Sequence, residues 1–120
     1  MSIGEATPFL FQNAAAGNGN GQEMQINPYQ ASAVIVAMTK ASGFDGTVNF
    51  EGTIDGTNYF AVQGASLAAA ATQGTTVAAA AMPACYRFVT SGLLAFRCRI
   101  SGQTTGTCTV TGHLAAGSAS

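Results

Sequence analysis

The stretch TVNFEGTIDGTNYFAV, residues 47–62, decides the fold class of this chain. Apolar and polar residues alternate along its first half, and a period of two places one set toward a core and the other toward solvent. The inward set is expected to be Val48, Phe50, Gly52 and Ile54. Asp55-Gly56 follows at once and is a strong hairpin signal, so residues 59–62 are expected to form the returning strand.

Short apolar runs broken by Gly, Asn and Asp continue on both sides of this hairpin. Residues 33–38 (AVIVAM) are apolar without interruption, which favours a central strand buried on both faces. Residues 107–114 alternate again and predict a closing strand. Together these runs predict an all-β fold, an antiparallel β-sandwich of jelly-roll or Greek-key type with about eight or nine short strands. Strand order is invisible at this level, so a barrel remains an alternative.

A second hairpin is predicted for residues 84–90 and 93–101. The register that places Phe88 opposite Leu94 keeps the apolar residues on one face and leaves Arg97 outside, whereas a slip of one residue would reverse every side chain.

The two ends of the chain differ from its middle. Residues 1–25 contain an apolar patch and then a Gly-, Asn- and Ala-rich segment, which predicts either an arm that reaches a neighbour or a first strand with a flexible loop. The sandwich domain is expected over residues 26–114, and residues 115–120 are expected to form a frayed tail. The Ala-rich segment 65–82 predicts a mobile loop with one helical turn near 66–71 and an edge strand near 75–80.

The charge of the chain is unusually sparse. Charged residues make up 8%, with four basic and five acidic side chains and a net charge of −1, against about 25% charged residues in an average domain. Nucleic acid is excluded as a partner because its binding needs several Lys or Arg contacts, and the same count argues against an anionic membrane surface. So few charges suit a protein packed against copies of itself or a partner, although uncharged polar side chains offer an alternative route to solubility.

Three cysteines, an odd count, do not form a disulfide framework. Strand parity points Cys98 and Cys108 inward and Cys85 to the other face, so we expect free buried thiols made in a reducing cytoplasm. A Cys98–Cys108 disulfide is the alternative. No Cys-x-x-Cys or Cys/His cluster supports a zinc site.

The chain contains no run of 18 apolar residues, so no transmembrane helix is expected. No signal peptide is expected at the N-terminus either.

Nothing in the chain assembles a catalytic group, so we predict that it is not an enzyme and has no cofactor. His113 is the sole histidine and its parity points it to solvent without an orienting partner. Asp45 and Asp55 each precede a glycine and are expected to cap turns through backbone N–H groups. Glu51 is expected to pair with Arg97 or Arg99 on the outer face.

The aromatic side chains supply the interface candidates. Most are expected in the core, but Tyr59 alternates away from Phe60 and is expected to be exposed. We take the following as candidates for contact with a partner: Phe9, Phe11, Tyr29 and Tyr59.

Residues 43–62 (GFDGTVNFEGTIDGTNYFAV) and 86–112 (YRFVTSGLLAFRCRISGQTTGTCTVTG) resemble small virion proteins of tailed bacteriophages. Those proteins carry a strand of the type TVxFEGSxDGxN followed by an aromatic residue, then an Arg-x-Arg strand and a closing SGTxTVTG strand. Here the arginine pair is Arg97 and Arg99, and the closing strand is residues 106–112. The two stretches make up less than half of the chain.

This resemblance implies a β-sandwich subunit of a virion, made in the host cytoplasm. The expected function is that of a capsid decoration or cement protein on the outer capsid surface. Its partners would be the major capsid protein and copies of itself, with a homotrimer suggested by the resemblance. A tail, neck or fibre component is the first alternative, and a receptor- or glycan-binding module is the second.

Overall fold

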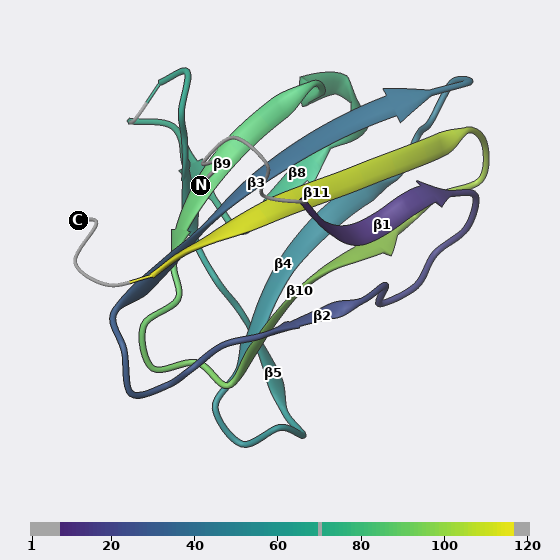
Figure 1. Cartoon of the computed structure of the whole chain (residues 1–120). Helices are drawn as coiled ribbons and strands as arrows, with labels where there is room; N and C mark the ends of the chain where they lie inside the picture. The colour runs from purple at the N-terminus through teal and green to yellow at the C-terminus, as the bar shows by residue number, and fades with distance from the viewer. Residues whose placement is uncertain (1–7, 70, 117–120) are drawn as a thin grey trace, which may run out of the picture.

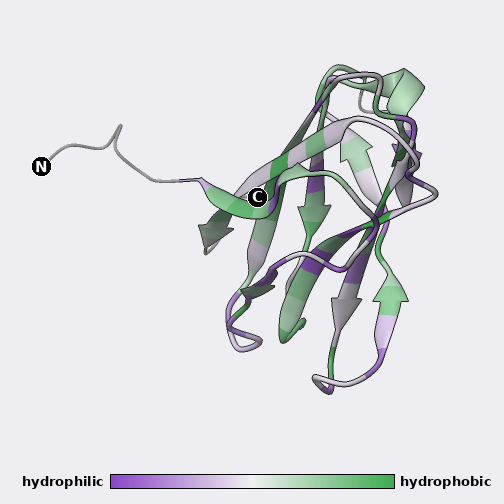
Figure 2. Cartoon of the chain, turned by 90° about the vertical axis from the view of Figure 1, so that its right-hand side faces the viewer, coloured by the Kyte–Doolittle hydropathy of each residue, from purple (hydrophilic) through white to green (hydrophobic). Residues whose placement is uncertain are grey.

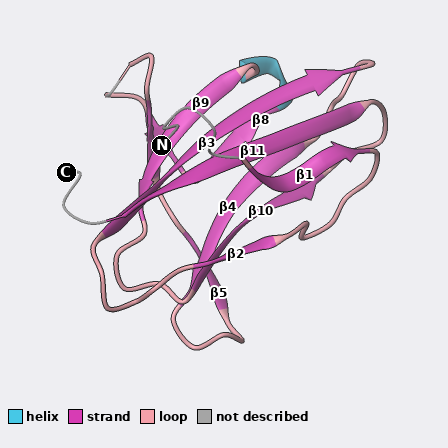
Figure 3. Cartoon of the chain, in the orientation of Figure 1, coloured by secondary structure: helices cyan, strands magenta, loops and turns pink. Residues whose placement is uncertain are grey.

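Two antiparallel β-sheets face each other across an apolar core in the computed structural model, which describes residues 8–69 and 71–116 (Figure 1). The described part contains 11 strands and one 3-10 turn, Ala79–Ala81 (Figure 3). The strands are β1 (Phe9–Ala15), β2 (Glu23–Gln25), β3 (Ser32–Ala41), β4 (Thr47–Thr53), β5 (Tyr59–Ala61), β6 (Gly64–Ser66), β7 (Gln73–Gly74), β8 (Thr76–Ala78), β9 (Ala84–Val89), β10 (Ala95–Ser101) and β11 (Thr107–Ala116). The predicted all-β sandwich is confirmed, with more strands than the eight or nine that were expected.

The first sheet, here called sheet A, has the strand order β1-β11-β3-β9-β6-β7, and the second, sheet B, has the order β2-β10-β4-β5 with β8 also paired to β4. β3 is central in sheet A because β11 pairs along its whole length on one side and β9 pairs on the other. β4 and β10 form the centre of sheet B through seven consecutive residue pairs.

The core lies between the sheets, where alternate residues of each strand point inward. Three phenylalanines hold its centre and are fully buried: Phe50, Phe88 and Phe96. The ring centroids of Phe50 and Phe88 are 4.4 Å apart and those of Phe88 and Phe96 are 5.0 Å apart, so the two sheets interlock through aromatic contacts. Figure 2 shows the resulting interleaving of hydrophobic and polar segments along the strands.

The inward parity of residues 47–54 is confirmed for Val48, Phe50 and Gly52 but is wrong for Ile54, which is exposed. Thr53 is fully buried instead. Its Oγ1 accepts the N–H of Gly56 at 2.9 Å. The turn that this bond closes begins at Thr53, so the alternation of inward and outward side chains ends one residue earlier than the sequence predicts. The expected Asp55-Gly56 hairpin is present, with β4 and β5 antiparallel.

The second predicted hairpin is wrong, because its two strands lie in different sheets. β9 pairs with β3 and β6 in sheet A, whereas β10 pairs with β2 and β4 in sheet B. The chain crosses between the sheets after Thr90, whose N–H donates to the carbonyl of Ser32 at 3.1 Å. Both strands turn their apolar faces to the same core. Cys98 therefore points inward and Arg97 and Arg99 point outward as predicted, although the predicted pairing of the two strands is wrong.

Two further expectations about strands need correction. Residues 33–38 form a central strand, but Ile35 and Ala37 are half-buried because the outer face of sheet A is not covered by another layer. In β11, Leu114 is exposed rather than inward, while His113 is exposed as predicted.

Residues 9–25 form β1, β2 and the loop that joins them. β1 pairs with β11, and β2 pairs with β10. Gln12 closes this side of the sandwich, because its Nε2 donates to the carbonyl of Cys98 in sheet B at 2.8 Å. Residues 1–7 of the expected arm and 117–120 of the expected tail lie outside the described residues, and Ala115 and Ala116 still pair with β3.

The Ala-rich segment contains the predicted edge strand as β8, which pairs with β4. The helical turn predicted near residues 66–71 is wrong: among residues 66–69 and 71 the structure has strand, bend and turn, and the 3-10 turn lies later, at Ala79–Ala81. Ser66 pairs with Tyr86 of β9, so the backbone at the start of this segment is extended and not helical.

Candidate interaction surface

Three neighbouring loop segments at one end of the sandwich each carry large exposed apolar side chains. We call this end, formed by residues 26–31, 54–60 and 89–94, the apolar end; in Figure 1 it lies at the bottom, around β5. Four of its side chains are mostly exposed: Tyr29 (94%), Val89 (68%), Ile54 (66%) and Phe60 (60%). The three segments are neighbours, because Ile26 N–H donates to the Leu94 carbonyl at 2.9 Å and Leu94 N–H donates to the Thr53 carbonyl at 2.8 Å. Exposed apolar side chains on neighbouring segments are candidates for an interaction site.

The loops of the apolar end are held by hydrogen bonds. The Asp55 carboxylate accepts the backbone N–H groups of Asn58 and Thr57, each at 2.8 Å, and these bonds hold its pKa well below the ordinary value. Ser32 N–H donates to the Ser91 hydroxyl at 2.9 Å and ties the 90–94 loop to β3. A surface on anchored loops loses less conformational entropy when it binds.

The apolar end carries very little charge. Asp55 is the only ionisable acid or base among residues 26–31, 54–60 and 89–94 apart from the two tyrosines, and its charge is already satisfied by the turn. Burying this end against a partner therefore requires little desolvation of charged groups.

The opposite end of the sandwich is polar, and hydrogen bonds join its loops to one another. Asp45 accepts hydrogen bonds from the side chain and backbone of Thr104 and from the backbone of Thr105, which lower its pKa to about 2. Gln103 N–H donates to the Asn18 side chain at 2.8 Å. The sequence suggested that Asp45 caps only its own turn, whereas in the structure it joins two loops.

The four interface candidates from the sequence are placed in different environments. Tyr29 lies at the apolar end and is almost fully exposed, whereas Phe11 is fully buried inside the chain. Phe9 is half-buried against Phe11, with ring centroids 4.8 Å apart. Tyr59 is half-buried because the Arg97 guanidinium covers its ring at 3.7 Å, and burial raises the pKa of its hydroxyl to about 12.

Sequence reasoning missed the other members of the apolar end. Ile54 and Phe60 flank the Asp55-Gly56 turn, and Val89 ends β9 directly before the crossing between sheets. The exposure of Phe60 follows from the position of β5 at the edge of sheet B, and the sequence gives no signal for it because strand order is not visible there.

The outer face of sheet B carries the predicted ion pair in an extended form. Glu51 binds both Arg97 and Arg99, at 2.8 and 3.0 Å. Burial opposes the charged form of Glu51, but hydrogen bonds and charge from Arg99 and Arg97 outweigh it and lower its pKa. The charges of this face are therefore held in an ion-pair network, with one carboxylate shared by two guanidinium groups, and the face offers less to a partner than the apolar end.

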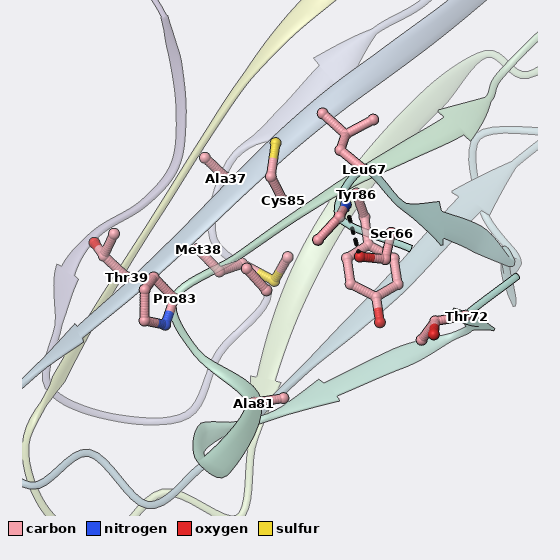
Figure 4. Close-up of a pocket in the computed structure, with 12 residues that line it drawn as sticks. Ala37, Met38, Thr39, Ser66, Leu67, Thr72, Ala81, Pro83, Cys85 and Tyr86 are labelled. Atoms are coloured by element: carbon pink, nitrogen blue, oxygen red, sulfur yellow. Dashed lines mark hydrogen bonds between the residues drawn. The ribbon is translucent and has the colours of Figure 1, made fainter. Parts of the chain in front are cut away.

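A cleft of about 770 Å³ lies beside β3 and β9 of sheet A. Figure 4 shows its lining from β3, from β9 and from the segment after β6, including Met38, Leu67 and Tyr86. Its lining contains no histidine and no carboxylate, so no base stands beside the Cys85 thiol, whose pKa burial raises. The lining of the cleft is mainly apolar and places no base beside the thiol.

All three cysteines are free, and burial raises the pKa of the Cys108 thiol to about 11 and that of Cys98 well above its ordinary value. Within residues 8–69 and 71–116, no group of three or more His, Cys, Asp or Glu side chains is placed to hold a metal ion. The same residues include no helix with the length and apolar character needed to cross a membrane.

No protein-family model matches the sequence, and no curated protein does. Two solved structures share its fold. The crystal structure of the SPBc2 prophage-derived protein YomS matches with a TM-score of 0.77 and 19% identity over 92% of this chain and 91% of that one. The crystal structure of the PBSX exported protein XepA matches with a TM-score of 0.79 and 19% identity over 92% of this chain and 37% of that one.

At this level of identity the likeness establishes the fold alone. The protein is a two-sheet β-sandwich of the kind found in these two phage-derived proteins. It spans nearly the whole of YomS but little more than a third of XepA.

Proposed function

We propose that this protein is a structural component of a phage virion, and specifically a decoration or cement protein that binds the outer surface of the assembled head. Three observations support this proposal: the strand motifs at residues 43–62 and 86–112, the fold shared with two phage-derived proteins, and the apolar end. The apolar end carries the proposal, because it is the surface through which the chain would dock on the major capsid protein.

The energetics of this surface favour attachment in several copies. Fully burying one large apolar side chain contributes about 1.5–3 kcal/mol, so four contribute roughly 6–12 kcal/mol. Association itself costs about 4–15 kcal/mol, so a single copy would bind weakly. Copies joined as a homotrimer would bind a repeating lattice much more tightly through effective concentration, and binding only to the assembled shell would stabilise that shell by linkage.

A tail, neck or fibre component is the second candidate, since the same surface would then join copies of the chain in a ring or tube. A receptor- or glycan-binding module is less well supported, because the chain contains no tryptophan and Tyr29 is its one aromatic side chain that is almost fully exposed among the described residues.

The test is co-sedimentation and cryo-electron microscopy of the purified protein with undecorated capsids of the parent phage. We expect ordered density on the outer shell for the native chain and loss of binding for the double variant Tyr29→Ser, Phe60→Ser. Leu67→Ser is the matched control, because Leu67 is 56% exposed but lies outside the apolar end. Density at the tail or neck only, or equal binding by all three proteins, would overturn the proposal.

A further inference from the structure

The loop between β1 and β2 contains two consecutive Asn-Gly pairs, Asn18-Gly19 and Asn20-Gly21. All four residues are exposed. Asn-Gly is the dipeptide most prone to spontaneous loss of the side-chain amide, because glycine has no Cβ to shield its backbone nitrogen. The local sequence is nearly the same for both pairs, so any difference in their reactivity must come from the fold.

The reaction needs a free backbone nitrogen and a free side-chain amide. The nitrogen of the glycine loses its proton to hydroxide and attacks the Asn side-chain carbonyl carbon, forming a five-membered succinimide and releasing ammonia. Water then opens the ring at either carbonyl and leaves aspartate or isoaspartate. The balance is one water consumed and one ammonia released, with no oxidant or reductant.

In the first pair, both the backbone nitrogen and the side-chain amide that would react are held by hydrogen bonds. Gly19 N–H donates to the Ile100 carbonyl at 3.1 Å, and its carbonyl accepts the Ile100 N–H at 2.9 Å. The Gln12 side chain donates to the same Gly19 carbonyl at 3.2 Å. The Asn18 side-chain oxygen accepts the Gln103 N–H at 2.8 Å. Attack at Asn18 therefore requires the bridge between Gly19 and β10 to open first.

The second pair is not held in this way. Within residues 8–69 and 71–116, neither the Asn20 side chain nor the Gly21 N–H takes part in a hydrogen bond. The next anchor follows at Gln22, whose N–H donates to the Phe11 carbonyl at 3.0 Å. Both residues are exposed, and neither the nucleophilic nitrogen nor its target is held by a hydrogen bond in the folded protein.

We propose that Asn20 is a spontaneous deamidation site in the folded protein and that Asn18, two residues earlier in an equivalent sequence, is protected by its bonds to Ile100 and Gln103. The modification adds one negative charge to a chain whose net charge is −1. The isoaspartate product also lengthens the backbone between two fixed points, the Gly19–Ile100 bridge and the Gln22–Phe11 bond. It would therefore loosen the connection between β1 and β2.

The experiment is incubation of the full chain in mildly alkaline buffer, followed by digestion after glutamate and tandem mass spectrometry of the peptide that ends at Glu23. Isoaspartyl methyltransferase labelling gives an independent readout of the isoaspartate product. We expect deamidation at Asn20 to be at least about tenfold faster than at Asn18 in the folded protein, as a local opening equilibrium would produce. In concentrated urea the two rates should become similar.

Two variants complete the design. Asn20→Gln should remove most of the folded-state modification, and Asn18→Gln should leave the rate at Asn20 unchanged. Equal rates at both sites in the folded protein, a faster rate at Asn18, or reaction at both sites only in urea would each overturn the proposal.

Discussion

Glu51 is the residue on which the sparse charges of this chain converge. Its carboxylate is held by Arg97 and Arg99 on the outer face of sheet B, and Arg97 in turn lies over the Tyr59 ring. The Glu51 and Arg97 side chains are each only 15% exposed, so the group is closer to a partly buried network than to an ordinary surface ion pair.

Replacing Glu51 by glutamine should lower the free energy of unfolding by about 1–3 kcal/mol at neutral pH, because two arginines lose their shared partner. The pKa of Glu51 is lowered in the folded state from its ordinary value of 4.5. Its stabilising effect is therefore present above pH 4.5 and is lost as the pH falls through the folded-state pKa. Urea denaturation of both proteins at neutral pH and in acid measures this difference.

Glu23→Gln is the matched control, since Glu23 lies opposite Arg97 on the same face but is exposed. Its effect should stay within about 0.5 kcal/mol. A Glu51→Gln effect of the same size in acid as at neutral pH would show that packing, and not charge, is responsible.

At the scale of elements, the approach of β6 to β9 depends on one glycine. Gly64 pairs with Phe88, and a Cβ at Gly64 would lie 2.3 Å from the Phe88 ring. That ring is fully buried and contacts Phe50 and Phe96, so it has no free space into which to move.

Gly64→Ala should therefore destabilise the protein by about 1–3 kcal/mol through overpacking. Gly17→Ala is the control: nothing lies within 4 Å of a Cβ at that position, and its effect should be small or slightly stabilising. Thermal unfolding measures both, and hydrogen exchange of the β6 and β9 amides locates the damage. Equal melting temperatures for the two variants would contradict the close contact.

At the scale of the whole molecule, low charge and an apolar end combine to favour association. The isoelectric point is about 5.5, and near that pH the electrostatic repulsion between copies vanishes. The apolar end then becomes the dominant surface between molecules in solution.

We expect light scattering to show the greatest self-association near pH 5.5 and less at neutral pH, where the net charge is −1. The variant Tyr29→Ser, Phe60→Ser should reduce this association without changing the melting temperature, because both side chains are mostly exposed. Leu67→Ser should associate like the native chain. Association that is unchanged in the double variant would place the contact elsewhere on the surface.

The candidate site was only partly predictable from the sequence. Tyr29 was singled out and is exposed at the apolar end, but Phe11 from the same set is fully buried. Ile54 was expected inside and is exposed. Whether each of these side chains is buried depends on whether another strand or loop packs over it, and the hydrophobicity of the residue does not show this.

Local sequence was enough to establish the strands, the hairpin at Asp55-Gly56 and the inward parity of Val48, Phe50 and Cys98. These features follow from the period-two geometry of an extended chain and from turn chemistry, which act over a few neighbouring residues. The small number of charged residues is likewise read directly from the sequence.

Tertiary structure alone decided which strands pair and which apolar residues stay outside. β9 and β10 are adjacent in sequence, yet β9 joins β3 and β10 joins β4, because pairing is chosen by contacts between residues far apart along the chain. The same long-range choice leaves Tyr29, Ile54, Phe60 and Val89 uncovered at one end, where three loops meet and no further strand packs over them.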